Sequence, residues 1–159
     1  MKPLTILVAE DDLLSRMVLE RSVVQWGHHL LSAVDGEKAH QLLETHVVDV
    51  CIMDWEMPGL SGIELCKWLR SYGKNTPYVI LVTSKDQPED IQSGYEAGAD
   101  DYLIKPYDLK YLRRRISTVA EKKQCQQALL DQAREQTGVA ALTPLDLYVS
   151  DLSLMRRRT

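Results

Sequence analysis

Acidic side chains follow two apolar runs of this chain, at the point where each run ends. Glu10, Asp11 and Asp12 come directly after the first run, and Asp54 comes directly after the third. If these runs are parallel strands of one sheet, their carboxyl ends meet at one edge and bring the carboxylates together. Such a cluster is unfavourable unless a cation lies among its members or some of them are protonated, and carboxylate oxygens suit Mg²⁺. The pattern therefore predicts a magnesium site at one edge of a sheet.

A hydroxyl and an ammonium group are expected beside the same carboxylates. Thr83 closes the fourth apolar run and Lys105 closes the fifth. These are the donors that a phosphoryl group needs. Taken singly, each residue has an ordinary explanation, since Asp11 or Asp12 could cap a helix and Lys105 could be a surface lysine. Because all the run ends agree on one chemistry, we expect a site that receives a phosphoryl group.

Five short apolar runs must position these side chains. The first, third and fourth are almost continuously apolar and rich in Ile, Leu and Val, which is typical of strands covered on both faces of a parallel sheet. A helical pattern follows each run. This alternation predicts an α/β fold with a doubly wound, five-stranded parallel sheet and five helices. The expected strands are Leu4–Ala9, His29–Ala33, Val47–Met53, Tyr78–Thr83 and Asp101–Lys105.

Turn and capping residues mark the expected helices. The fifth helix differs from the others, because no Gly or Pro occurs between Asp108 and Gly138. At about 1.5 Å per residue, a helix over this stretch is longer than a compact domain needs. The first four helices are expected from Leu13 to just before Gly27, after Asp35-Gly36, after Ser61-Gly62, and from Pro88 to Gly98.

Composition limits the class of function. The 159 residues, 45% hydrophobic and 26% charged, are typical of a soluble globular protein with room for one ordinary domain. A net charge of -4 argues against a dominant basic surface for nucleic acid. No apolar run is long enough to span a membrane or to form a signal peptide. Cys51, Cys66 and Cys125 are too widely spaced for a metal knuckle, so reduced thiols in a cytoplasmic protein are expected.

Four segments together resemble the receiver domains of bacterial two-component response regulators. The segments are ILVAEDD, IMDWEMPGLSGIEL, ILVTS and GADDYLIKP, and the resemblance extends from Leu4 to about Glu121. It implies a flavodoxin-like sheet with strand order 2-1-3-4-5, a receiver domain over 1–121 and a separate helical extension and tail over 122–159. It also implies a cytoplasmic signalling switch that is not an enzyme beyond its own phosphorylation and dephosphorylation.

The resemblance further assigns roles to residues. It implies that Asp54 accepts a phosphoryl group from a phosphohistidine of a sensor histidine kinase or phosphotransfer protein. Thr83 is then drawn toward the phosphate, Tyr102 rotates into the vacated space, and the surface of the fourth helix, fifth strand and fifth helix changes shape. The implied catalytic residues are Asp54, Thr83 and Lys105, and the implied switch residues are Thr83 and Tyr102. The implied Mg²⁺ ligands are Glu10, Asp11, Asp54 and the carbonyl of Glu56. Glu56 and Lys85 are implied to tune the lifetime of the phosphorylated form.

The segment after the receiver resemblance leaves several alternatives open. Residues 121–136 carry only a thin apolar stripe, so a solvated extension and a two-helix coiled coil are both considered. Leu142–Thr159 faintly resembles the opening strand of a winged-helix output domain, which would make the chain a truncated regulator. The run Arg113-Arg114-Arg115 could be a solvated cationic face, or it could pair with acidic residues of a second copy and give a homodimer. The acidic residues available for such pairing are Glu89, Asp90, Glu96, Asp100 and Asp101. Direct binding of nucleic acid is not expected.

Two other functions compete with the switch. A Mg²⁺-dependent phosphatase with an aspartyl-phosphate intermediate would typically carry Asp two residues after its nucleophile, where this chain has Glu56. A phosphate-independent interaction module of the same fold would lack the acceptor, the acidic pair or the lysine, and all are present. A flavin site is not supported, because no Ser/Thr/Gly-rich phosphate loop follows the first run. A competent receiver is the expected function.

Overall fold

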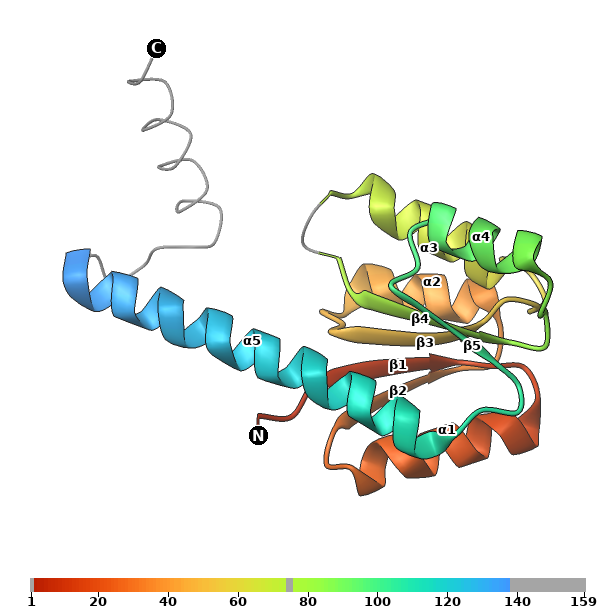
Figure 1. Ribbon diagram of the computed structural model, residues 1–159, viewed down its shortest axis with the longest axis horizontal. Helices are drawn as coiled ribbons and strands as arrows, with labels where there is room; N and C mark the ends of the chain where they lie inside the picture. The colour runs from red at the N-terminus through yellow and green to blue at the C-terminus, as the bar shows by residue number, and fades with distance from the viewer. Residues whose placement is uncertain (1, 74–75, 138–159) are drawn as a thin grey trace, which may run out of the picture. The chain divides into compact units, whose positions relative to one another are not determined.

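Five parallel strands form one sheet in the computed structural model of the chain, which describes residues 2–73 and 76–137 (Figure 1). The strand order is β2-β1-β3-β4-β5, and each neighbouring pair runs parallel. The doubly wound sheet and its predicted order are therefore confirmed. The strands are β1 (Thr5–Ala9), β2 (His29–Ala33), β3 (Val50–Asp54), β4 (Tyr78–Thr83) and β5 (Asp101–Ile104).

Helices cover both faces of the sheet (Figure 1). Side-chain caps begin three of them where the sequence predicted: Asp12, Asp35 and Ser61 each accept a hydrogen bond from a main-chain N–H in the first turn. One face carries α1 (Leu13–Gln25) and the first turns of α5 (Leu109–Thr137), and the other carries α2 (Gly36–Thr45), α3 (Gly62–Ser71) and α4 (Pro88–Glu96).

The central strands supply most of the core. All five residues of β3 are buried, as expected for a strand covered on both faces. Side chains alternate between the faces, so Leu7, Met53 and Leu81 join a cluster with Leu65 of α3, while Ile52 faces the opposite layer. Each fully buried side chain of this size contributes about 1.5–3 kcal/mol. This packing fixes the strand ends that carry the polar residues described below.

Strand boundaries differ from the expected ones at four places. β3 ends at Asp54, one residue after Met53. β3 begins at Val50 and not at Val47, whose side chain is 88% exposed. Its pairing with β1 starts only at Ile6 opposite Val50, and apolar character alone does not reveal where pairing starts. β1 begins one residue later than predicted, at Thr5, and β5 ends at Ile104, one residue before Lys105.

The apolar residues of α1 are not all part of the core. The helix lies where predicted, and Leu19 and Val23 are buried. Leu13, Leu14 and Val18, however, are 59%, 74% and 48% exposed. Their spacing indicated a helix but not which residues face the sheet, so α1 presents an apolar surface to solvent.

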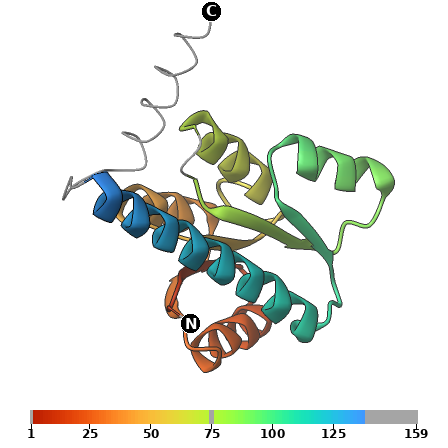
Figure 2. The ribbon, with the colours of Figure 1, turned by 60° about the vertical axis from the view of Figure 1, so that its left-hand side comes forward.

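The fifth helix is extended, as predicted. α5 runs unbroken over 29 residues (Figure 2). Contacts along the chain divide it into two units, one of residues Lys2–Ser117 and a second that begins at Thr118, so the predicted boundary after 121 and the coiled coil stay predictions. The predicted winged-helix segment Leu142–Thr159 and its arginines lie outside the described residues. None of the helices within the described ranges combines the length and apolar character that a bilayer crossing requires.

Candidate functional site

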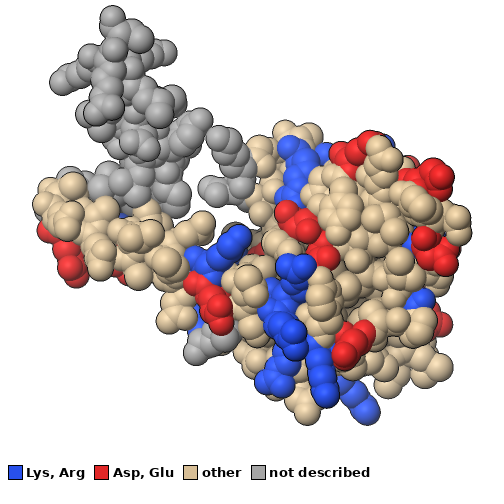
Figure 3. Space-filling view, in the orientation of Figure 1, with Lys and Arg blue, Asp and Glu red and all other residues tan. Residues whose placement is uncertain are grey.

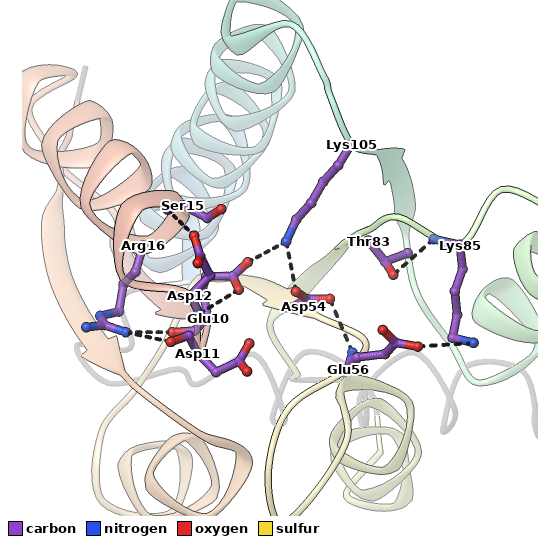
Figure 4. A network of polar contacts seen from close by, with 10 residues as sticks. All are labelled: Glu10, Asp11, Asp12, Ser15, Arg16, Asp54, Glu56, Thr83, Lys85 and Lys105. Atoms are coloured by element: carbon purple, nitrogen blue, oxygen red, sulfur yellow. Dashed lines mark hydrogen bonds and ion pairs between the residues drawn. The ribbon is translucent and has the colours of Figure 1, made fainter.

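The carboxyl ends of β1, β3 and β5 bring together four of the predicted site residues (Figure 4). Glu10 and Asp11 follow β1, Asp54 ends β3, and Lys105 follows β5. Glu10, Asp11 and Asp54 each place one carboxylate oxygen within 4.8 Å of those of the other two. Nζ of Lys105 donates to Oε2 of Glu10 and to Oδ2 of Asp54, at 2.8 Å in both cases. We refer to Glu10, Asp11 and Asp54 as the acidic cluster.

Burial and pairing set the charges of this site. Burial raises the pKa of Glu10, whose side chain is 1% exposed, and the neighbouring charge of Asp54 adds to this while Lys105 opposes it. Burial also acts to lower the pKa of Lys105, but hydrogen bonds to Asp54 and Glu10 outweigh it, so the pKa is raised. Lys105 therefore keeps its positive charge beside the Asp54 carboxylate.

Asp12 has a different role from its two acidic neighbours. Its Oδ2 accepts a hydrogen bond from the main-chain N–H of Ser15 at 2.8 Å and so caps α1. This bond is the main reason that the pKa of Asp12 is lowered. The N–H of Asp12 in turn donates to Oε1 of Glu10 at 3.1 Å. The helix-cap explanation thus holds for Asp12, and not for the two residues that reach the acidic cluster.

The two residues expected to tune the phosphorylated form touch each other at the rim of the cluster. The main-chain N–H of Glu56 donates to Oδ1 of Asp54 at 3.2 Å, and Oε1 of Glu56 lies 3.4 Å from Nζ of Lys85. The same ammonium lies 5.3 Å from the ring centre of Trp55. Glu56 and Lys85 therefore form a paired rim next to the predicted acceptor.

Both predicted switch residues bond to the main chain of Lys85. Oγ1 of the buried Thr83 accepts from the N–H of Lys85 at 3.3 Å, and the hydroxyl of Tyr102 donates to its carbonyl at 2.8 Å. The Tyr102 ring is 9% exposed and packs 6.4 Å, centre to centre, from both Trp55 and Tyr95. Burial, with nearby carboxylates, raises the pKa of Tyr102 to about 12. The ring already occupies the buried position, so the predicted switch requires a second, outward position.

Sequence reasoning missed Arg16. Its Nη1 donates to the main-chain carbonyl of Glu10 at 3.0 Å and reaches that of Asp11 at 3.4 Å (Figure 4). The available signal was its place in the first turn of the helix that follows the acidic run. An arginine at that position can reach back to the carbonyls that precede the helix.

Arg115, in the basic run of α5, has a partner within the chain. Figure 3 shows Lys and Arg side chains gathered along α5. Nε of Arg115 lies 2.9 Å from Oδ2 of Asp101, and Nη2 of Arg70 lies 2.6 Å from Oδ2 of Asp100. Two of the acidic residues considered for pairing across a subunit interface are therefore engaged within one copy, and the homodimer stays a prediction.

Comparison with known proteins gives one consistent result. The family model of the response regulator receiver domain matches residues 6–117. Response regulator MprA of Mycolicibacterium vanbaalenii is 38% identical over 120 residues, which are 76% of this chain and 52% of that protein. Response regulator RppA of Synechocystis is 34% identical over 151 residues, which are 89% of this chain and 62% of that protein. The chain thus spans about half to three-fifths of the length of these relatives.

Solved structures that are similar to this chain include receiver domains of response regulators. The receiver domain of the Francisella response regulator 1452 is similar with a TM-score of 0.71 and 35% identity, covering 76% of this chain and 98% of that one. The BeF3-activated receiver domain of DrrB is similar with a TM-score of 0.69 and 28% identity, and the match covers 76% of this chain and 99% of that one. The similarity therefore covers these receiver domains almost completely.

Proposed function

Because this chain belongs to the family of response regulator receiver domains, we propose that it is a phosphorylation-dependent switch of a two-component system whose acceptor is Asp54. The observation that carries the proposal is the position of Lys105, whose Nζ lies 2.8 Å from carboxylate oxygens of both Asp54 and Glu10. An ammonium group held beside an otherwise acidic cluster is suited to bind a phosphoryl oxygen. The proposed donor is a phosphohistidine of a sensor histidine kinase or phosphotransfer protein, and the proposed location is the cytoplasm.

The transfer is a displacement at phosphorus. A carboxylate oxygen of Asp54 forms a bond to phosphorus while the bond from phosphorus to the donor's histidine nitrogen breaks, and the electron pair returns to the imidazole. Hydrogen bonds from Lys105 and from the N–H of Glu56 fix the Asp54 carboxylate before the donor arrives. Water later cleaves the aspartyl phosphate and regenerates the carboxylate. The chain acts only on its own phosphoryl group, so we do not propose an enzyme.

The acidic cluster fits a divalent cation. Three carboxylates meet within 4.8 Å, and their oxygens are the donors that Mg²⁺ prefers. Lys105 supplies one positive charge against three negative ones, which leaves the cluster short of positive charge. Glu10, Asp11 and Asp54 would hold Mg²⁺, with the carbonyl of Glu56 as the further ligand expected from the family. When bound, Mg²⁺ screens the repulsion between the carboxylate and the phosphoryl group.

A surface beside the acceptor suits the phosphodonor. A cavity of about 620 Å³ lies between α1 and the segment after β5, and its lining includes Leu14, Val18, Lys105 and Tyr107. Leu14 and Val18 are both exposed apolar residues of α1. Exposed apolar patches commonly mark interaction sites. A donor bound here would lie against Lys105, and this supports the proposed phosphotransfer to Asp54.

Beryllofluoride, a stand-in for the phosphoryl group, tests the proposal. We expect it to change Trp55 fluorescence when Mg²⁺ is present, in a Trp26→Phe, Trp68→Phe background that leaves Trp55 as the fluorophore. The change should be lost in Asp54→Ala and kept in the control Asp86→Ala, which removes an exposed carboxylate. An unchanged response in Asp54→Ala would reject Asp54 as the acceptor.

A further inference from the structure

Three side chains link strand β2 to the main chain of the acidic cluster. Oγ of Ser32, in β2, donates to Oε1 of Glu20 in α1. The same Glu20 oxygen lies 3.6 Å from Nε of Arg16. Nη1 of Arg16 then donates to the carbonyl of Glu10 at 3.0 Å and lies 3.4 Å from that of Asp11. The chain of contacts therefore ends on the two residues that bring acidic side chains from β1 into the cluster.

The main chain needs this support because it lies between two regular elements here. Ala9 is the last residue of β1 that pairs with both neighbouring strands. The first hydrogen bond of α1 is accepted by the carbonyl of Asp12. The carbonyls of Glu10 and Asp11 thus come after the strand ladder and before the helix, and buried or half-buried carbonyls require donors. Arg16, whose side chain is 14% exposed, supplies one.

The members of the acidic cluster are anchored in different ways. Lys105 holds the carboxylates of Glu10 and Asp54 directly. Asp11 is exposed and reaches the cluster from the stretch of main chain that Arg16 holds. We propose that Arg16 is a positioning residue, which fixes the main chain at Glu10 and Asp11 so that the Asp11 carboxylate points into the cation site. The inference rests on the proposed function, because it concerns the cation that the cluster would bind.

Positioning and simple charge predict opposite results for Arg16. A guanidinium near a cation site repels the cation, so an arginine that acted only through its charge would weaken Mg²⁺ binding. Its removal would then tighten binding. If Arg16 positions a ligand, its removal loosens the site and weakens binding, by about tenfold as is typical of residues that support metal ligands. The direction of the change therefore decides between the two.

The test measures Mg²⁺ affinity of the unphosphorylated protein by calorimetry, in wild type, Arg16→Met, Arg16→Lys and Arg21→Met. We expect Arg16→Met to bind about tenfold more weakly. Arg16→Lys keeps the charge and one donor group, so it should recover part of the affinity. Arg21 is an exposed arginine of the same helix, and its substitution should leave the affinity unchanged. Amide NMR signals of Asp11 and Asp12 should shift in Arg16→Met before Mg²⁺ is added.

The outcomes separate this inference from the proposed function. Failure of the wild type to bind Mg²⁺ would reject the metal site of the proposed function. Normal binding by wild type, with equal or tighter binding by Arg16→Met, would overturn only the role of Arg16. Lower thermal stability of Arg16→Met with unchanged affinity would also overturn it. If Arg16→Met does not fold, Glu20→Gln removes the charged partner of Arg16, and wild-type affinity in that variant would count against positioning.

Discussion

Lys85 and Glu56 form an ion pair at the rim of the acidic cluster, with Nζ of Lys85 3.4 Å from Oε1 of Glu56. The main chain of Lys85 also bonds to Thr83 and Tyr102. One residue thus joins the rim of the proposed acceptor site to both predicted switch residues. A change at the rim can therefore reach both switch residues through Lys85 alone.

Breaking the rim pair should shorten the life of the phosphorylated form. The pair lies next to Asp54, so we expect it to hinder a water molecule that approaches an aspartyl phosphate there. A partly exposed pair contributes at most about 1 kcal/mol, which corresponds to at most about a fivefold change in rate. We expect Lys85→Met and Glu56→Gln each to speed dephosphorylation within this limit, as measured by the decay of phosphoprotein after donor removal.

The double variant distinguishes the pair from its separate members. Because both single variants remove the same contact, Lys85→Met combined with Glu56→Gln should be little faster than either one. Lys67→Met, a substitution of an exposed lysine on α3, serves as the control and should decay at the wild-type rate. Rate changes that simply multiply in the double variant would show that the ion pair itself has no effect.

Gly94 permits the buried position of Tyr102. A Cβ atom at this position of α4 would lie 2.8 Å from Cδ2 of Tyr102 and 3.3 Å from Cδ1 of Leu81. We expect Gly94→Ala to push the ring outward, although Ala favours helix by about 1 kcal/mol over Gly. Tyrosine nitration followed by peptide mapping should then show greater modification of Tyr102. The control Ser93→Ala, on an exposed position of the same helix, should not, and equal modification in all three proteins would contradict the prediction.

His28 should make stability depend on pH. Its Nδ1 accepts a hydrogen bond from the N–H of Leu4 at 3.1 Å, which only an unprotonated Nδ1 can do. Burial, helped by the nearby His29, lowers the pKa of His28. The unfolded chain therefore binds this proton first, so stability falls as pH drops through about 6.5 and levels off below the folded-state pKa.

Urea unfolding between pH 8 and pH 5 measures this loss. In His28→Asn the side-chain oxygen can still accept from the N–H of Leu4 but does not titrate. This variant should therefore lose less stability than the wild type between pH 8 and pH 5. His46→Asn, which changes an exposed histidine, should retain the wild-type profile. A pH dependence that is identical in His28→Asn and wild type would exclude His28 as its source.

Asp100 should be important for stability. Its Oδ2 accepts from Nη2 of Arg70 at 2.6 Å and from the N–H of Val79 at 2.8 Å, and so joins α3, β4 and the segment before β5. Asp100→Ala leaves both donors without this acceptor, which costs about 1–3 kcal/mol. Chemical unfolding should show that loss, while the exposed Asp86→Ala should change stability by less than about 0.5 kcal/mol. Equal stability of the two variants would argue against this role.

The sequence predicted the elements better than their boundaries or their buried faces. Continuous apolar runs and caps such as Asp35 and Ser61 act locally, so they marked strands and helix starts correctly. Where β3 begins depends instead on its pairing with β1, and which side of α1 is buried depends on packing against the sheet. These are contacts between segments distant in the sequence, and the spacing of apolar residues does not predict such contacts. Val47 and Leu14 are exposed for this reason.

In the site, too, the features that depend on local sequence could be predicted, and the contacts between distant side chains could not. Each acidic residue of the cluster lies at the carboxyl end of a strand, and parallel strands end at one edge, so their meeting could be predicted. The contact between Glu56 and Lys85 and the contacts of Arg16 depend on how long side chains fold back over loops. Residue type and spacing do not determine such conformations. The sequence identified Tyr102 as a switch residue but not where its ring lies in this structure, because that position depends on the space left by Gly94.

Intact-mass spectrometry with acetyl phosphate and Mg²⁺ measures whether Asp54 accepts a phosphoryl group. We predict that the wild-type chain gains the mass of one phosphoryl group, that chelation of Mg²⁺ prevents the gain, and that peptide mapping places the group on Asp54. Asp54→Asn should gain no mass, while Asp86→Asn should behave as wild type. A phosphoryl group that still appears on Asp54→Asn, or a wild-type chain that gains none, would contradict the account.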